Sequence, residues 1–295
     1  MPLEIDSELL PTEGDIAFYE EHGWFASSVI LSPEQLEDAN YGAERFYSGE
    51  RDRKLPIRLG YLHWSPEDGD VLRQNDYVSL QNDEISDLVA TPVLSAIAGS
   101  LARTESIRLF HDQLIYKPPT AEPTTTVGWH SDRAYWKTCT SENMLTAWVP
   151  FAATTAEGGT LMFLDGSHKW PRVEELSTFG EQNHESVEEL YASLGYPIKR
   201  IAMELRPGQV SFHHCRLIHG SQPNSADVPR LALAVHFQDS TNRYTPATNA
   251  EGHEVVHIND VLCRQGADGL PDYGDSDVCP LLWVAQSETT TEGQR

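Results

Sequence analysis

The spacing of apolar residues in the first third of the chain is typical of helices. Ser32, Pro33 and Gln35 occupy the N-cap, first and third positions of a capped helix start, ahead of an apolar face with helical period. A shorter helix is predicted to end at Gly23, because glycine is the usual residue just past a helix C-terminus. A strongly apolar helix is predicted over residues 92–101.

From about residue 106 onwards, the pattern changes to short apolar runs separated by turns that contain Gly and Pro. Strands are predicted over residues 107–110, 113–117, 144–151, 159–164, 209–213 and 230–238. Many short strands of this kind indicate a sandwich or barrel with helices packed outside it. The acidic stretch 174–194 has helical spacing, and we expect it to form an insertion between strands, of the kind that often acts as a lid.

The domain organisation follows from the absence of a Gly-, Ser- or Pro-rich linker, which predicts a single domain over residues 1–285. Its helical part covers about residues 1–105 and its strand-rich core about residues 106–283. Residues 286–295 carry no apolar anchor and are predicted to be a disordered tail.

The charge of the chain narrows the choice of partners. Its 295 residues include 21 Lys and Arg against 45 Asp and Glu, which gives a net charge of −24. Such a surface repels phosphate backbones, so nucleic acid is not an expected partner. Solubility explains the acidity, and recruitment of a cationic substrate is the alternative explanation.

Cysteine usage and hydropathy predict a cytoplasmic location. The four cysteines form no CxxC pair and are too few for a disulfide scaffold, which fits a reducing compartment. No run of 18 apolar residues is present, so neither a transmembrane helix nor a membrane partner is expected. The first 30 residues are acidic, unlike a secretory signal. The sequence leaves the oligomeric state open.

The segment Gly128-Trp129-His130-Ser131-Asp132 carries the strongest candidate chemistry. On an extended backbone, His130 and Asp132 point to the same side and can hold two corners of one metal ion. His219 is the natural candidate for a third ligand. Two histidines and one carboxylate on one face form the ligand set of non-haem Fe(II) oxygenases, although a lone H-x-D is common by chance.

Arg230 strengthens this reading because it begins the apolar run 231–235. A buried guanidinium without a partner is energetically costly. The residue is explained if a dicarboxylate cosubstrate pairs with it at one end and chelates the metal at the other. The alternative is an internal Asp or Glu partner.

Taken together, the motifs resemble the phytanoyl-CoA dioxygenase (PhyH-like) family of Fe(II)/2-oxoglutarate oxygenases, over about residues 15–283. The residues that carry the resemblance are His130-Ser131-Asp132, Tyr135-Trp136, Trp148, Gly158-Gly159-Thr160-Leu161, Gly166-Ser167-His168, His219-Gly220-Ser221, Arg230 and Pro280-Leu281-Leu282-Trp283. The H-x-D motif alone is weak, but the combination at this spacing is strong.

The resemblance implies a mainly β fold with flanking helices, built on a double-stranded β-helix (jelly-roll, cupin-like) core. It also implies Fe(II) on His130, Asp132 and His219, with 2-oxoglutarate and O2 as cosubstrates and the distal carboxylate of 2-oxoglutarate on Arg230. Trp148 is implied to line the cosubstrate pocket. Three further cosubstrate contacts are expected at Gln113, Thr146 and Ser221.

Substrate contacts are expected in the N-terminal segment and in the loop after the H-x-D motif, as in the family. The candidates are Tyr61, Trp64, Arg73, Arg133, Tyr135 and Trp136. Arg133 either anchors an anionic substrate group or pairs with a surface acid.

The resemblance implies an oxygenase that hydroxylates or otherwise oxidises a C–H bond of a small molecule in secondary metabolism, releasing succinate and CO2. Asp132 is retained, whereas halogenating relatives replace this carboxylate, so halogenation is not expected. Desaturation, epimerisation and ring formation remain open, because the same ligands serve each. The alternatives are a non-catalytic jelly-roll binding protein and a zinc hydrolase that uses the same triad, for which Arg230 has no use.

Overall fold

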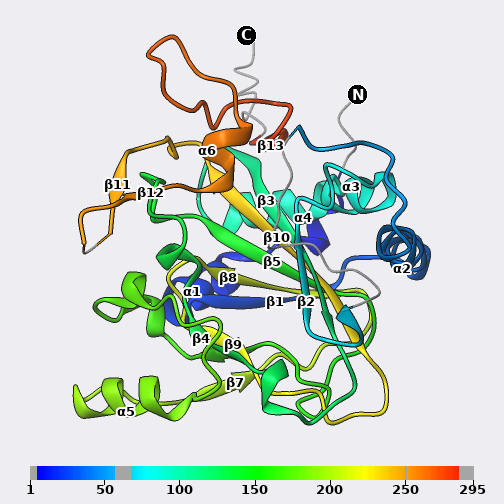
Figure 1. The fold of residues 1–295 in the computed structure, drawn as a ribbon, viewed down its shortest axis with the longest axis vertical. Coiled ribbons are helices and arrows are strands. Elements are labelled where there is room, and N and C mark those ends of the chain that lie inside the picture. The colour runs from blue at the N-terminus through cyan, green and yellow to red at the C-terminus, as the bar shows by residue number, and fades with distance from the viewer. Residues whose placement is uncertain (1–4, 57–67, 250, 286–295) are drawn as a thin grey trace, which may run out of the picture.

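Two antiparallel sheets build the core of the protein in the computed structural model, which describes residues 5–56, 68–249 and 251–285 (Figure 1). The predicted tail 286–295 therefore lies outside the described residues, as do Tyr61 and Trp64. The major sheet has the order β1 (Trp24–Val29), β8 (Gln209–His214), β5 (Leu145–Pro150), β10 (Arg230–Asp239), β3 (Ser106–Lys117) and β13 (Leu281–Val284), and β2 (Arg73–Asp76) also pairs with β3. The first third of the chain is thus not only helical, because it supplies β1 and β2.

The smaller sheet contains the two motif histidines, His130 and His219. Its order is β4 (Val127–His130), β9 (His219–Ser221), β6 (Met162–Leu164) and β7 (Arg200–Ala202). A separate hairpin pairs β11 (Ala247–Thr248) with β12 (Glu254–Val255). Apolar side chains of both main sheets, including Trp148 on β5 and Phe163 on β6, pack into one cluster between them. The arrangement confirms the predicted jelly-roll architecture with flanking helices.

Strict alternation in the major sheet separates a helix-facing side from an interior side. On β10, Leu233 and Val235 pack against the helices, whereas Ala232 and Ala234 face the smaller sheet. The two sides of a strand alternate with period two, so Arg230 at the start of β10 lies on the interior side. Polar residues on this side of the sheet therefore point into the space between the sheets.

Helices cover the outer faces. The structure places α1 (Glu13–His22), α2 (Pro33–Tyr47), α3 (Asp83–Val89) and α4 (Pro92–Leu101) against the major sheet, α5 (Glu185–Ser193) against the smaller one, and α6 (Ile258–Leu262) near β13 (Figure 1). Short 3-10 turns lie at Ser7–Leu9, Pro123–Thr125, Asp132–Ala134, Ser167–Lys169 and Val173–Glu175. The predicted capping box of Ser32 and Gln35 is present, and Gly23 ends α1 with φ of 79°.

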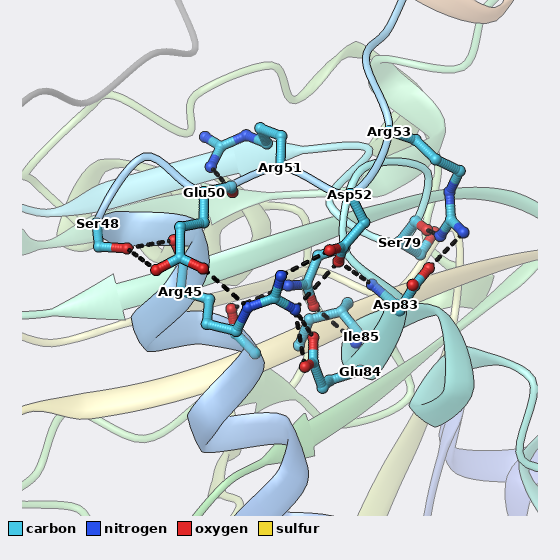
Figure 2. Close-up of polar contacts among 12 residues, drawn as sticks. Arg45, Ser48, Glu50, Arg51, Asp52, Arg53, Ser79, Asp83, Glu84 and Ile85 are labelled. Carbon is cyan, nitrogen blue, oxygen red and sulfur yellow. Dashed lines mark hydrogen bonds and ion pairs between the residues drawn. The ribbon is translucent and has the colours of Figure 1, made fainter.

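A charged network ties α2 to the start of α3 and to the segment between them (Figure 2). The Arg45 guanidinium contacts Glu84 at 2.7 Å, Asp52 at 2.6 Å and Glu50 at 3.2 Å. Arg53 of the same segment donates to the carbonyl of Ser79 at 3.1 Å. The network thus fixes the chain that follows β2.

One stretch of the described chain, Asp83–Leu101, has the length and apolar composition of a membrane-spanning helix, and 61% of it is buried inside the fold. The stretch is divided into α3 and α4 by Ala90 and Thr91. Ile85, Leu94 and Ile97 pack into the main hydrophobic cluster, which accounts for its apolar character.

Candidate active site

His130, Asp132 and His219 meet at one end of the smaller sheet. His130 ends β4 and pairs directly with His219 at the start of β9. Ligand atoms of the three side chains lie within 4.8 Å of one another, and all three residues are buried. The backbone is extended through His130 and Ser131, and the 3-10 turn begins only at Asp132, so the two side chains lie at either end of a short extended segment.

Backbone carbonyls orient both imidazoles toward the same point. The Nδ1 atom of His130 lies 2.8 Å from the Gly128 carbonyl, and that of His219 lies 2.9 Å from the Leu217 carbonyl. A carbonyl only accepts, so Nδ1 carries the proton in each ring and Nε2 keeps its lone pair for a metal. Burial lowers the pKa of His130 to about 3, which keeps the ring neutral.

Asp132 is held ionised. Burial alone raises the pKa of this carboxyl, but the imidazoles of His219 and His213 outweigh burial and hold the pKa well below its usual range. The Thr146 hydroxyl donates to Asp132 Oδ2 at 2.6 Å, and His213 Nε2 lies 3.4 Å from the same oxygen. Two imidazoles and one carboxylate are a donor set that suits Fe(II).

Two cavities meet at this triad. The outer cavity has a volume of about 320 Å³ and the inner one lies between the sheets. Both are lined by His130, Asp132, Gln113, Phe179 and His236. A metal ion on the triad therefore has access to two separate ligand spaces.

The inner cavity ends at the buried guanidinium of Arg230, and the buried amine of Lys117 lies behind the Ser221 side chain that lines the cavity. Arg230 donates through Nη1 to the Gly159 carbonyl at 3.0 Å, lies 5.5 Å from the Trp148 ring, and leaves its Nε without a partner. Lys117 Nζ contacts the Ser221 hydroxyl and the Gln222 carbonyl, each at 2.5 Å. No ion pair reaches either cation from the described residues, so the alternative of an internal acidic partner for Arg230 has no support there.

Burial shapes the protonation of both cations. It lowers the pKa of Arg230 to about 10. Burial, aided by the charge of Arg230, lowers the pKa of Lys117 to about 6. Two buried basic groups with an orphaned N–H fit the far carboxylate of a dicarboxylate such as 2-oxoglutarate.

The predicted cosubstrate residues gather in the inner cavity. Trp148, Thr146, Gln113, Ser221 and Arg230 all line it. They come from β5, β3, β9 and β10, whose interior faces converge there.

Of the four predicted substrate residues that the structure describes, two line the outer cavity and two do not. Tyr135 and Trp136 line the outer cavity. Arg73 does not: it stacks 4.0 Å from the Tyr116 ring and pairs with Asp70 at 3.2 Å, because alternation on β2 turns Gln74 and Asp76 to the cavity instead. Arg133 also lies away from both cavities.

Arg133 forms no ion pair with an acid among the described residues, and it lines neither cavity. Its guanidinium donates to the backbone carbonyls of Trp136 and of Cys139, the latter at 3.0 Å. The side chain therefore closes the loop after the H-x-D motif. Closing this loop requires hydrogen-bond donors from the Arg133 guanidinium but no acidic side chain to pair with its charge.

Several cavity residues were not predicted from the sequence. Asp76, His111, His236 and His257 line the outer cavity, together with Phe179 from the predicted insertion. His236 had a readable signal, because it lies six residues after Arg230 on the same face of β10. The others depend on strand pairing and on loop paths that carry no local signature.

Comparisons with known proteins agree with this geometry. The family model described as phytanoyl-CoA dioxygenase (PhyH) matches residues 19–232. Rat peroxisomal phytanoyl-CoA dioxygenase is 24% identical over 92% of this chain and 82% of its own length. A probable alpha-ketoglutarate-dependent hypophosphite dioxygenase from Stutzerimonas stutzeri is 27% identical over 69% of this chain and 76% of its own.

The fold is similar to that of solved structures as well. The non-heme alpha-ketoglutarate-dependent epimerase SnoN from nogalamycin biosynthesis is 25% identical, with a TM-score of 0.65 over 92% of this chain and 98% of its own. SnoN has also been crystallised with Fe3+, alpha-ketoglutarate and nogalamycin RO.

Proposed function

The chain belongs to the phytanoyl-CoA dioxygenase family, and on that premise we propose that it oxidises a C–H bond of a small molecule of secondary metabolism. Like its relatives, it is a 2-oxoglutarate-dependent dioxygenase that uses Fe(II), 2-oxoglutarate and O2. In the proposed reaction, one oxygen atom of O2 enters succinate as CO2 is lost, and the other enters the substrate as a hydroxyl group. His130, Asp132 and His219 are the proposed iron ligands.

A single observation carries the assignment: the triad lies where an inner cavity that ends at the buried Arg230 meets a second, roomier cavity. A zinc hydrolase needs no buried Arg230 and Lys117 behind its metal, and a binding protein needs no ligand-ready imidazoles. The inner cavity offers Arg230 and the Ser221 hydroxyl to the far carboxylate of 2-oxoglutarate.

The iron, once 2-oxoglutarate is bound to it, supplies the activation of dioxygen and the oxidising power. The side chains supply binding and orientation. Thr146 fixes one oxygen of Asp132, which leaves Oδ1 for the metal. Trp148 forms an apolar wall beside Arg230, and Phe179 lies over the junction of the two cavities, 5.1 Å from the His130 ring.

The setting of the reaction is inferred from relatives and from composition. SnoN, an epimerase from nogalamycin biosynthesis, supports a tailoring role. All four cysteines are buried and free, which supports a reducing, cytoplasmic compartment.

The test is an anaerobic visible spectrum of the Fe(II) protein before and after addition of 2-oxoglutarate. Bidentate chelation by a 2-oxo acid gives a weak charge-transfer band. We expect the band in the wild type and in His253→Ala, which alters an exposed histidine, but not in His219→Ala. A wild type that binds Fe(II) without developing the band would refute the proposal.

A further inference from the structure

We propose that the substrate enters the outer cavity with a protonated amine or amidinium group, and that the Asp76 carboxylate binds this cation. The inference rests on the proposed function and adds a substrate class to it.

Asp76 lies in the wall of the outer cavity, and among the described residues its carboxyl group has no basic partner. It ends β2 and lies directly opposite Gln113 of β3, whose side chain lines both cavities. The carboxyl contacts the Gln113 amide, but its Oδ1 is buried without a hydrogen-bond partner among the described residues. A buried acceptor of this kind is costly unless a ligand supplies the donor.

The described lining of the outer cavity contains no Lys or Arg. Its other carboxylate, Asp132, belongs to the triad. Burial lowers the pKa of His257 to about 3, so this imidazole is neutral and offers no positive charge. An anionic substrate group therefore finds no charge partner there, whereas a cation finds Asp76.

The remaining walls also suit a cation. Tyr77, Tyr135, Trp136 and Phe179 also line the outer cavity, so its walls carry four aromatic side chains. Aromatic rings attract cations through their negative faces, most strongly where water is excluded. A cation next to Asp76 thus gains from the walls as well as from the carboxylate.

The wall that carries Asp76 is held in place independently of any ligand. Tyr77 has φ of 57°, an uncommon conformation for a bulky residue, and its hydroxyl donates to Asn259 Oδ1 at 2.7 Å. The Asp112 carboxylate accepts from the backbone N–H groups of Val78 and Ser79 at 2.9 and 3.1 Å. Asp76 is therefore presented by a rigid turn.

The protonation of Asp76 leads to the same inference. Burial raises the pKa of this carboxyl to about 7, so it is not fully ionised in the empty cavity. A cation beside it lowers the pKa again and restores the charge. The net charge of −24 favours the approach of such a substrate.

The test uses three probes of nearly one shape: benzylamine, benzyl alcohol and benzoate. Each is titrated calorimetrically into anaerobic protein loaded with Fe(II) and 2-oxoglutarate. We expect benzylamine to bind about tenfold or more tightly than benzyl alcohol, and benzoate to bind most weakly. Asp76→Asn, which has the shape of the protonated acid, should remove the preference for benzylamine and leave benzyl alcohol unchanged.

Asp87→Asn is the matched control, because it removes the same charge from an exposed position on α3. Benzoate binding as tightly as benzylamine, no binding of any probe, or unchanged benzylamine affinity in Asp76→Asn would overturn the inference. The order of the three probe affinities can be measured in the wild type alone, so this part of the test does not depend on whether a variant folds. The charge-transfer band keeps the two proposals apart: its presence alongside a missing amine preference refutes only the substrate class.

Discussion

Lys117→Met tests whether the second buried cation binds 2-oxoglutarate. The substitution keeps the length of the side chain and removes only the ammonium group that contacts Ser221 and Gln222. Hydrogen bonds to charged groups are worth about 1.5–3 kcal/mol, about 10- to 150-fold in Kd. That gain is available only to protonated Lys117, whose pKa in the protein is about 6.

The pH dependence follows from this pKa. Protonating Lys117 costs about 1.4 kcal/mol for each pH unit above 6. At pH 6 the variant should therefore bind 2-oxoglutarate about tenfold or more weakly than the wild type, and by about pH 8 the two should converge. The wild type should also take up close to one proton on binding near pH 7, because a bound carboxylate raises the pKa of the amine.

The effect of Lys117→Met on stability has the opposite sign. Between pH 6 and 10.5 the unfolded chain binds a proton at Lys117 that the folded protein does not, so wild-type stability rises with pH across this window. The variant lacks this dependence. Without ligand it should be more stable than the wild type, most clearly at low pH, and the difference should disappear above pH 10.5.

The assay is calorimetry of anaerobic Fe(II) protein with 2-oxoglutarate at pH 6 and pH 8, in two buffers of different ionisation enthalpy, with thermal unfolding in parallel. Lys199→Met, at an exposed lysine, is the control. Equal Kd values for the wild type and Lys117→Met at pH 6, or equal proton uptake, would show that Lys117 is only a packing residue.

Three further substitutions test other parts of the site and fold. Arg230→Ala should raise the 2-oxoglutarate concentration needed for half-maximal charge-transfer absorbance far more than it changes Fe(II) affinity; an unchanged value would make Arg230 structural. Thr146→Val removes the donor to Asp132 and should weaken Fe(II) binding about 10- to 100-fold in a chelator competition, whereas a change below twofold would contradict its positioning role. Gly99→Ala would place a Cβ 2.3 Å from the Trp283 ring and should destabilise the protein by about 1–3 kcal/mol in denaturant unfolding; Ser100→Ala is the control, and equal stability would contradict the close packing of α4 on this ring.

The strands and the triad could be predicted because their signals are local. The apolar run 231–235 predicts β10, and the H-x-D motif together with His219 and Arg230 predicts a metal site before any contact is known. Residues 107–110 and 113–117 were predicted as two strands, but the structure joins them into β3, since His111 and Asp112 continue the ladder with β10. Hydropathy alone predicts a strand end at a polar pair such as His111 and Asp112, even where the pair lies inside a buried strand.

The outer cavity could not be predicted in the same way, because strand pairing assembles it. Asp76 reaches Gln113 only through the pairing of β2 with β3, and nothing within the residues of β2 marks it as part of a sheet. Lys117 was treated only as the end of a strand, although it lies on the same face as Gln113. Arg73 is expected at the substrate from the family's use of the N-terminal segment, yet it lies one position out of phase with the cavity-lining residues of its strand.

The charges on the two sides of the triad are opposite, and this separation has a consequence for selectivity. Arg230 closes the inner cavity with Lys117 behind its Ser221 wall, and Asp76 lies in the wall of the outer cavity. A dicarboxylate that entered the outer cavity would meet a carboxyl group and no cation, whereas an amine in the inner cavity would meet two basic groups. Each proposed ligand is therefore rejected where the other binds. Neither cavity has to select between 2-oxoglutarate and the substrate by shape alone. Residues in the wall of the outer cavity can therefore be substituted without weakening the binding of 2-oxoglutarate.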